Sequence, residues 1–75
     1  MNQNAYFKKY GKAYQEKIFQ AFITDKNWAA QMCEVMTPEY FELKYLKFLT
    51  ENYFNFYIQY KSFPSFPALL NIVKE

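Results

Sequence analysis

Several residue types on which catalysis and metal binding depend are missing or rare in this chain. The 75 residues contain no His, no Arg, one Cys and one Gly. Without His, and with Cys33 as the single thiol, the chain has neither a His/Cys metal set nor an internal disulfide framework. A phosphate-binding loop needs several glycines followed by Lys and Ser or Thr, and Gly11 stands alone. We therefore expect no catalytic, cofactor-binding or metal-binding residue and no nucleotide hydrolysis.

The remaining candidates for chemistry fit structural roles better. Cys33 falls on the apolar face of a predicted helix and has no His to activate it, so we interpret it as a small buried apolar residue. Glu39 and Glu42 are three residues apart and Glu16 precedes Gln20 by four, spacings that let each pair share a helical face. Carboxylates at helix starts and on solvated surface explain them. We expect no small-molecule substrate.

The chain also has no long apolar run. Nothing approaches the ~20 consecutive apolar residues of a membrane span, and the N-terminus carries lysines without the apolar segment of a signal peptide. A lone cysteine fits a reducing compartment. Lys, Asn, Ile, Phe and Tyr, which A/T-rich codons encode, are abundant, as in an AT-rich phage or bacterial genome. We expect a soluble cytoplasmic protein of a bacterial cell, phage-infected or not.

The spacing of apolar residues predicts an all-α protein, a small orthogonal bundle of about four helices without strands. Thr37-Pro38-Glu39 indicates the start of the third helix, because it supplies an N-cap hydroxyl, proline at the first helical position and a carboxylate in the first turn. Trp28 centres the apolar face of the second helix and is expected to be buried against the third. The predicted helices span residues 12–23, 26–36, 38–61 and 66–74.

Gly11 interrupts the first helical pattern and suggests a boundary, because glycine costs ~1 kcal/mol in a helix relative to Ala. We interpret residues 1–11 as a basic and aromatic extension, which frays or forms a separate turn. Residues 12–75 are the helical domain. The fourth helix ends within an amphipathic pattern, so we expect this domain to be truncated at its C-terminal end.

The third predicted helix carries more apolar residues than a small core needs. Phe48 and Ile58 fall among its polar residues, with Tyr45 nearby, and we assign these three as a candidate protein interface. An AT-rich genome would also scatter aromatic residues onto a surface, so this alternative stays open. The expected core stripe of the helix is Leu46, Leu49, Tyr53, Phe56, Tyr57 and Tyr60, widened by Leu43 and Phe54.

The first residues interleave lysines with aromatic rings. Lys8, Lys9, Lys12 and Tyr10 are weak candidates for nucleic-acid contact, since bases stack on rings while lysines meet phosphates. Without Arg, no bidentate reading of bases is available. The same aromatic residues also satisfy a helical core stripe, in which Tyr14 takes part.

The order of these signals resembles the N-terminal domain of DnaB-like replicative DNA helicases, particularly those of bacteriophages. The matching features are a helix ending at Asp25, a second helix from Trp28, the Thr37-Pro38-Glu39-Tyr40-Phe41 restart, a long helix and the Phe63-Pro64-Ser65 entry into another. The resemblance covers about residues 14 to 74. It implies a helical head that packs into a collar above a hexameric motor and receives primase or a helicase loader.

We therefore expect a non-catalytic assembly and partner-docking domain, which associates with itself, with primase or with a loader. The helical hairpin, linker and ATPase domain that such helicases carry are not within residues 1–75. A GxxxxGK[ST] loop encoded beyond Glu75 would support the helicase interpretation. The alternative is a stand-alone small phage or bacterial helical protein that binds a host protein or single-stranded DNA.

Overall fold

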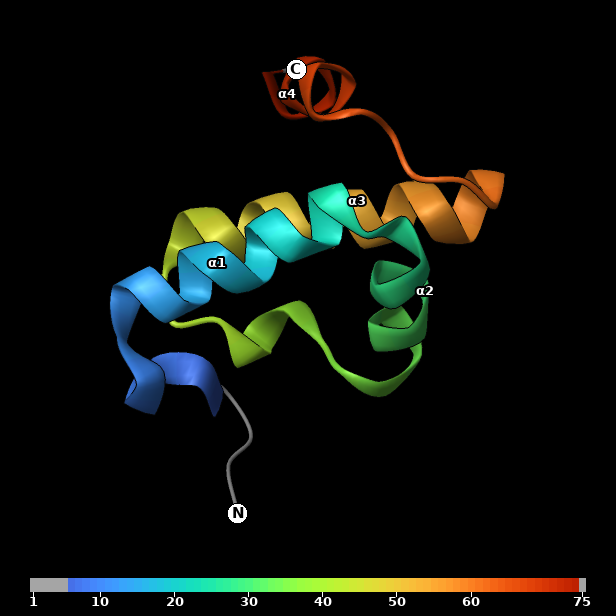
Figure 1. Ribbon diagram of the computed structural model, residues 1–75. Helices are drawn as coiled ribbons and strands as arrows, with labels where there is room; N and C mark the ends of the chain where they lie inside the picture. Colours follow the sequence, from blue (N-terminus) through green and yellow to red (C-terminus); the bar gives the residue numbers. More distant parts are fainter. Residues whose placement is uncertain (1–5, 75) are drawn as a thin grey trace.

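Residues 6–74 are described by a computed structural model of the chain. The elements in chain order are the 3-10 helix η1 (Tyr6–Tyr10), α1 (Gly11–Thr24), α2 (Lys26–Val35), the 3-10 helix η2 (Pro38–Tyr40), α3 (Lys44–Tyr60) and α4 (Phe66–Lys74). Figure 1 shows α1 and α3 side by side, α2 turning away at one end of them, and α4 set apart on the side remote from η1. The described residues form no strand, and none of their helices is long and apolar enough to cross a membrane. The expected small all-α bundle is confirmed.

Local signals explain most helix boundaries. The Asp25 carboxylate accepts a 3.0 Å hydrogen bond from the Trp28 amide and so caps the start of α2. Lys61 ends α3 in the left-handed region, at φ 63°. Ser65 Oγ accepts from the Ala68 amide at the start of α4. The predicted bounds of the first, second and fourth helices are confirmed to within one residue.

The predicted start of the third helix at residue 38 is wrong. Pro38 opens only the short turn η2, and Thr37 makes no side-chain capping hydrogen bond within the described chain. Phe41 and Leu43 are extended, so α3 begins at Lys44. The reason is tertiary, because the Phe41 ring is fully buried and lies 5.2 Å from the ring of Phe7. A helix continuing from Pro38 would not make this contact.

Gln15 holds the new helix start in place. Its side chain is fully buried on α1, and its Oε1 accepts hydrogen bonds from the amides of Glu42 (2.8 Å) and Leu43 (3.2 Å). Its Nε2 donates to the Gly11 carbonyl at 3.2 Å. The glutamine therefore fixes, from α1, the two residues that precede α3, while no side chain caps the first turn of α3 itself within the described residues.

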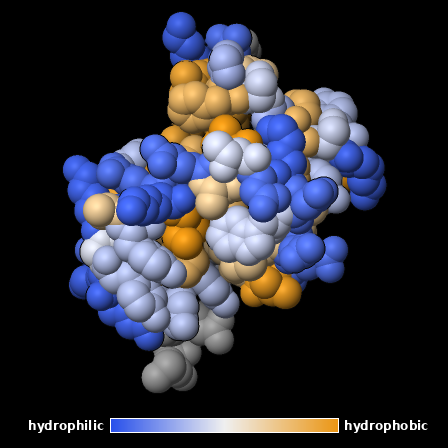
Figure 2. All heavy atoms as spheres, in the orientation of Figure 1, coloured by the Kyte–Doolittle hydropathy of each residue, from blue (hydrophilic) through white to orange (hydrophobic). Residues whose placement is uncertain are grey.

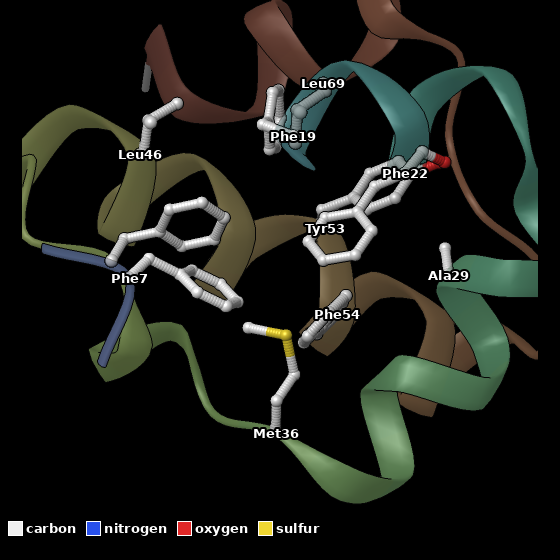
Figure 3. Close-up of a cluster of buried hydrophobic side chains, with 10 residues drawn as sticks. Phe7, Phe19, Phe22, Ala29, Met36, Leu46, Tyr53, Phe54 and Leu69 are labelled. Carbon is white, nitrogen blue, oxygen red and sulfur yellow. The ribbon is translucent and has the colours of Figure 1, made fainter. Parts of the chain in front are cut away.

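Aromatic side chains fill the interior between the helices. Phe22 on α1 is fully buried, with its ring centroid 5.4 Å from that of Phe54 and 6.3 Å from that of Phe41. Figure 3 shows Phe22, Tyr53 and Phe54 close together in the interior, with Leu69 from α4 above them. The core therefore draws on all four described α-helices, on η1 and on the loops on either side of η2.

Tyr53 is the polar member of this core. Its ring is fully buried, and its hydroxyl donates a 2.9 Å hydrogen bond to the Phe22 carbonyl. Burial raises the pKa of Tyr53 to about 12, so the hydroxyl stays protonated at neutral pH and keeps donating. This bond ties the middle of α3 to α1.

The buried stripe of α3 differs from the expected one. Leu46, Thr50, Tyr53 and Phe54 are buried, whereas Tyr60 is 58% exposed. Trp28 is also less buried than expected: it is half-buried, and its ring lies 5.1 Å from that of Phe22 on α1. The interior is already occupied by Phe22 and Phe54, so the indole covers the edge of the core.

The segment expected to be an extension contributes to the core from residue 6 onward. Phe7 in η1 is only 6% exposed, and Gly11, at φ +87°, turns the chain from η1 into α1. A positive φ suits glycine, which has no Cβ. Residues 1–5 of the predicted extension, and residue 75 at the predicted truncated end, lie outside the described residues.

Thr50 provides a test of the core. Its hydroxyl is fully buried and has no hydrogen-bond partner within residues 6–74. A buried unpaired hydroxyl costs about 1 to 3 kcal/mol, and valine has nearly the same shape. We expect Thr50→Val to raise the free energy of unfolding by about 1 kcal/mol, measured by urea unfolding.

The matched control for that substitution is Thr24→Val. Thr24 is exposed at the end of α1, where its hydroxyl bonds the Gln20 and Ala21 carbonyls. This change should not stabilise the protein. A loss of stability on Thr50→Val would show that the buried hydroxyl is satisfied in solution.

Candidate functional site

The three residues of the candidate interface all lie on α3 and all are exposed. The exposed fractions are 46% for Tyr45, 51% for Phe48 and 60% for Ile58. Phe48 is opposite the buried stripe, because it lies about half a turn from Thr50 and Tyr53 around the helix. These side chains contribute little to the core of the described chain.

The structure does not bring the three residues together as one patch. Tyr45 and Phe48 are three residues apart and so lie on adjoining turns. Ile58 follows Phe48 by ten residues, which places it about 15 Å along the axis and rotated by roughly 80°. Exposed Glu51 and Asn55 lie between them. The predicted interface is therefore two smaller areas.

Tyr45 has a partner within the protein. Its hydroxyl donates to the Glu16 carboxylate, which joins α3 to α1, and this hydrogen bond raises the pKa of Tyr45. Because the bond fixes the ring, Tyr45 forms the edge of the Phe48 area. A binding partner that used its hydroxyl would have to displace Glu16.

Ile58 forms one wall of a hollow between α3 and the α2–η2 connection. The hollow has a volume of about 290 Å³. Lys47 and Glu39 meet at its rim, with Nζ and Oε1 3.5 Å apart. The full lining is Cys33, Met36, Thr37, Pro38, Glu39, Lys47, Glu51, Phe54, Asn55 and Ile58. It is therefore a depression of mixed apolar and polar lining.

Cys33 lies in this hollow and is half-buried, less than expected. Burial, with a smaller contribution from Glu34, raises the pKa of the thiol. A raised pKa disfavours the thiolate that a nucleophile or metal ligand requires. No group of three or more His, Cys, Asp or Glu in residues 6–74 is arranged to hold a metal ion.

Sequence reasoning did not anticipate a second hollow beneath α4. It has a volume of about 360 Å³ and is lined by Phe19, Gln20, Ile23, Thr24 and Phe66. Figure 2 shows apolar residues gathered on α4 and between α4 and the rest of the molecule. The amphipathic pattern of the fourth helix was visible in the sequence. The separation between α4 and α1 was not visible in the sequence, because no local signal sets the distance between helices.

The lysine-rich segment lies at the opposite end of the molecule from α4 (Figure 1). Lys8, Lys9 and Lys12 are exposed, and Tyr10 is 46% exposed. The Lys9 ammonium lies 5.2 Å from the centre of the Tyr10 ring. The structure therefore groups the four weak nucleic-acid candidates on η1 and the first turn of α1.

Two further tyrosines join this group. Tyr6 is 48% exposed, and its ring centre lies 4.8 Å from the Lys9 ammonium. Tyr14 is 39% exposed, and its ring centre lies 4.6 Å from that of Tyr10. Tyr14 was expected in the core stripe. Its spacing of four from Tyr10 was the signal that the two rings would meet.

Comparison of the chain with models of protein families, with curated proteins and with solved structures finds no match.

Proposed function

We propose that this chain is a non-catalytic assembly and partner-docking domain. The observation that carries the proposal is the exposure of Phe48, on the side of α3 opposite the buried stripe, and of Ile58, at the edge of that stripe beside Phe54. Burying a large apolar side chain in a complex contributes about 1.5 to 3 kcal/mol. Aromatic and aliphatic anchors of this kind carry much of the free energy at protein interfaces.

Ile58 supports the proposal in a second way, because it stands beside a hollow. A partner side chain entering this hollow would meet the apolar Ile58 and Met36 and, beside them, the charged pair of Lys47 and Glu39. An apolar centre with a polar rim is the usual anatomy of an interface. The contact would depend on apolar burial and only weakly on salt.

The specific form of the proposal is a collar domain of a DnaB-like replicative helicase. It rests on the sequence pattern, namely the Thr37-Pro38-Glu39-Tyr40-Phe41 restart, the long helix and the Pro64 entry into α4. The partner would be a second copy of the chain, primase or a helicase loader. The motor domain of such a helicase lies outside these 75 residues.

Self-association tests the docking function. We expect sedimentation equilibrium at high protein concentration to give a mass above the monomer, which persists in about 0.5 M NaCl because the contact is apolar. Phe48→Glu or Ile58→Glu should lower that mass, since each places a charge in the buried contact. Both positions are exposed in the single chain, so the thermal melt should change little.

The control is Leu70→Glu, which places the same charge on an exposed apolar residue of α4. Its mass should equal that of the unmodified chain. Association that is equally lost in Leu70→Glu, or that disappears at high salt, would contradict docking through α3. A strict monomer that also fails to bind primase or loader would contradict the proposed function.

A further inference from the structure

Three tyrosines on η1 and α1 are exposed, although Tyr6 and Tyr14 also touch the buried ring of Phe7. The tyrosine row consists of Tyr6, Tyr10 and Tyr14, which are 48%, 46% and 39% exposed. Phe7, in the same segment, is 6% exposed and supplies the apolar contact to the interior. In this segment Phe7 is therefore buried in the core, and the three tyrosines are exposed to solvent.

The row is ordered by contacts between its own rings. The ring centres of Tyr10 and Tyr14 are 4.6 Å apart, and those of Tyr6 and Tyr10 are 6.4 Å apart. The Tyr6 ring also lies 5.4 Å from that of Tyr40 in η2. Rings that are held in place lose little side-chain entropy when a ligand stacks on them.

Positive charge accompanies the row. The Lys9 ammonium lies within 4.8 Å of the Tyr6 ring centre and 5.2 Å of the Tyr10 ring centre. Lys8 and Lys12 are exposed on either side of it in sequence. Residues 6–15 contain no carboxylate, and Glu16, the next acidic residue, accepts the Tyr45 hydroxyl. The segment therefore offers an anion three exposed lysines, of which Lys9 lies against the tyrosine rings.

We propose that the tyrosine row with Lys8, Lys9 and Lys12 binds single-stranded nucleic acid without sequence preference. Bases would stack on the tyrosine rings while the lysines neutralise phosphates, which is how single-strand grooves combine affinity with tolerance of sequence. The chain has no Arg to read base edges bidentately. This site lies on η1 and α1 and is separate from Phe48 and Ile58, so it does not depend on protein docking.

The test is fluorescence anisotropy with the full chain and a labelled oligo-dT of about 15 nucleotides, beside an abasic strand with the same number of phosphates. Three neutralised phosphates on a single strand give a salt exponent near −2, so raising NaCl from about 50 to about 200 mM should weaken binding roughly 20-fold. We expect oligo-dT to bind at least about fivefold more tightly than the abasic strand, because stacking contributes about 1 to 3 kcal/mol per base.

Two kinds of variant separate stacking from charge. Tyr10→Leu, or Tyr14→Leu as a second variant, should abolish the preference for oligo-dT over the abasic strand and leave the salt exponent unchanged. Lys8→Gln, Lys9→Gln and Lys12→Gln combined should bring the exponent close to zero. The control, Lys26→Gln, Lys61→Gln and Lys74→Gln combined, removes the same charge elsewhere and should preserve most of the binding.

Equal binding of both strands would overturn the proposal, since it would show attraction by charge alone. Equal loss of binding in the two triple lysine variants, or no binding at about 50 mM NaCl, would overturn it as well. Self-association of the Tyr10→Leu variant should match that of the unmodified chain. The outcome for nucleic acid therefore does not decide the outcome for protein docking.

Discussion

Replacing Phe22 by alanine should remove a large share of the stability of the protein. Phe22 is fully buried, and its ring contacts those of Phe19, Trp28, Phe41 and Phe54, which come from α1, α2, α3 and the loop before α3. Truncating a buried Phe costs about 3 to 5 kcal/mol. A chain of this length has about 4 to 11 kcal/mol of stability in total.

The measurement is urea unfolding followed by far-ultraviolet circular dichroism, with Phe48→Ala as the matched control. Phe48 is 51% exposed on α3, so the same deletion there should change the free energy of unfolding by less than about 0.5 kcal/mol. Equal losses of unfolding free energy for the two substitutions would contradict the core packing shown in Figure 3. Trp28→Ala should fall between them, because the indole is half-buried.

Gln15→Leu should cost about 2 to 4 kcal/mol, even though leucine suits both a helix and an apolar interior. Leucine cannot accept the hydrogen bonds that Gln15 Oε1 receives from the amides of Glu42 and Leu43. An N–H left without a partner costs about 1 to 3 kcal/mol when it is buried, and these two hydrogen bonds are partly buried. The substitution therefore destabilises the segment that leads into α3.

Hydrogen exchange localises this effect. In Gln15→Leu, the amides of Glu42 and Leu43 should exchange much faster, whereas amides in the middle of α3 should follow only the global loss of stability. The control is Gln20→Leu, an exposed position on the same helix, which should be nearly neutral. Unchanged protection at Glu42 and Leu43 would show that the glutamine does not hold this turn.

The two core substitutions also bear on the proposed interface. Phe22 positions the middle of α3, and Gln15 positions the two residues that precede it. The exposure of Phe48 and Ile58 depends on that position, because rotating α3 would exchange exposed for buried side chains. Association that is weakened in Phe48→Ala and lost in Phe48→Glu would link the apolar character of this position to binding.

Helix boundaries were predictable where the signals were local. Asp25 caps α2 three residues away, and Ser65 caps α4 over the same interval. The exposure of Phe48 and Ile58 was also predictable, since a helix of known register places each residue relative to its polar neighbours. The Thr37-Pro38-Glu39 signal was equally clear, yet it started only a 3-10 turn. A local preference of about 1 kcal/mol was outweighed by the burial of Phe41.

The sequence by itself determined that the chain is helical, where three of the four described α-helices begin and end, and that Phe48 and Ile58 on α3 are exposed. These properties depend on periodicity and capping, which act within about four residues along the chain. Only the tertiary structure decided where α3 begins, that Phe7 rather than its neighbouring tyrosines enters the core, and that a hollow lies beneath α4. These three features depend on contacts between residues far apart in the chain, such as that of Gln15 with Glu42, 27 positions away. Side chains also compete for places in one interior, and no local sequence pattern encodes the result.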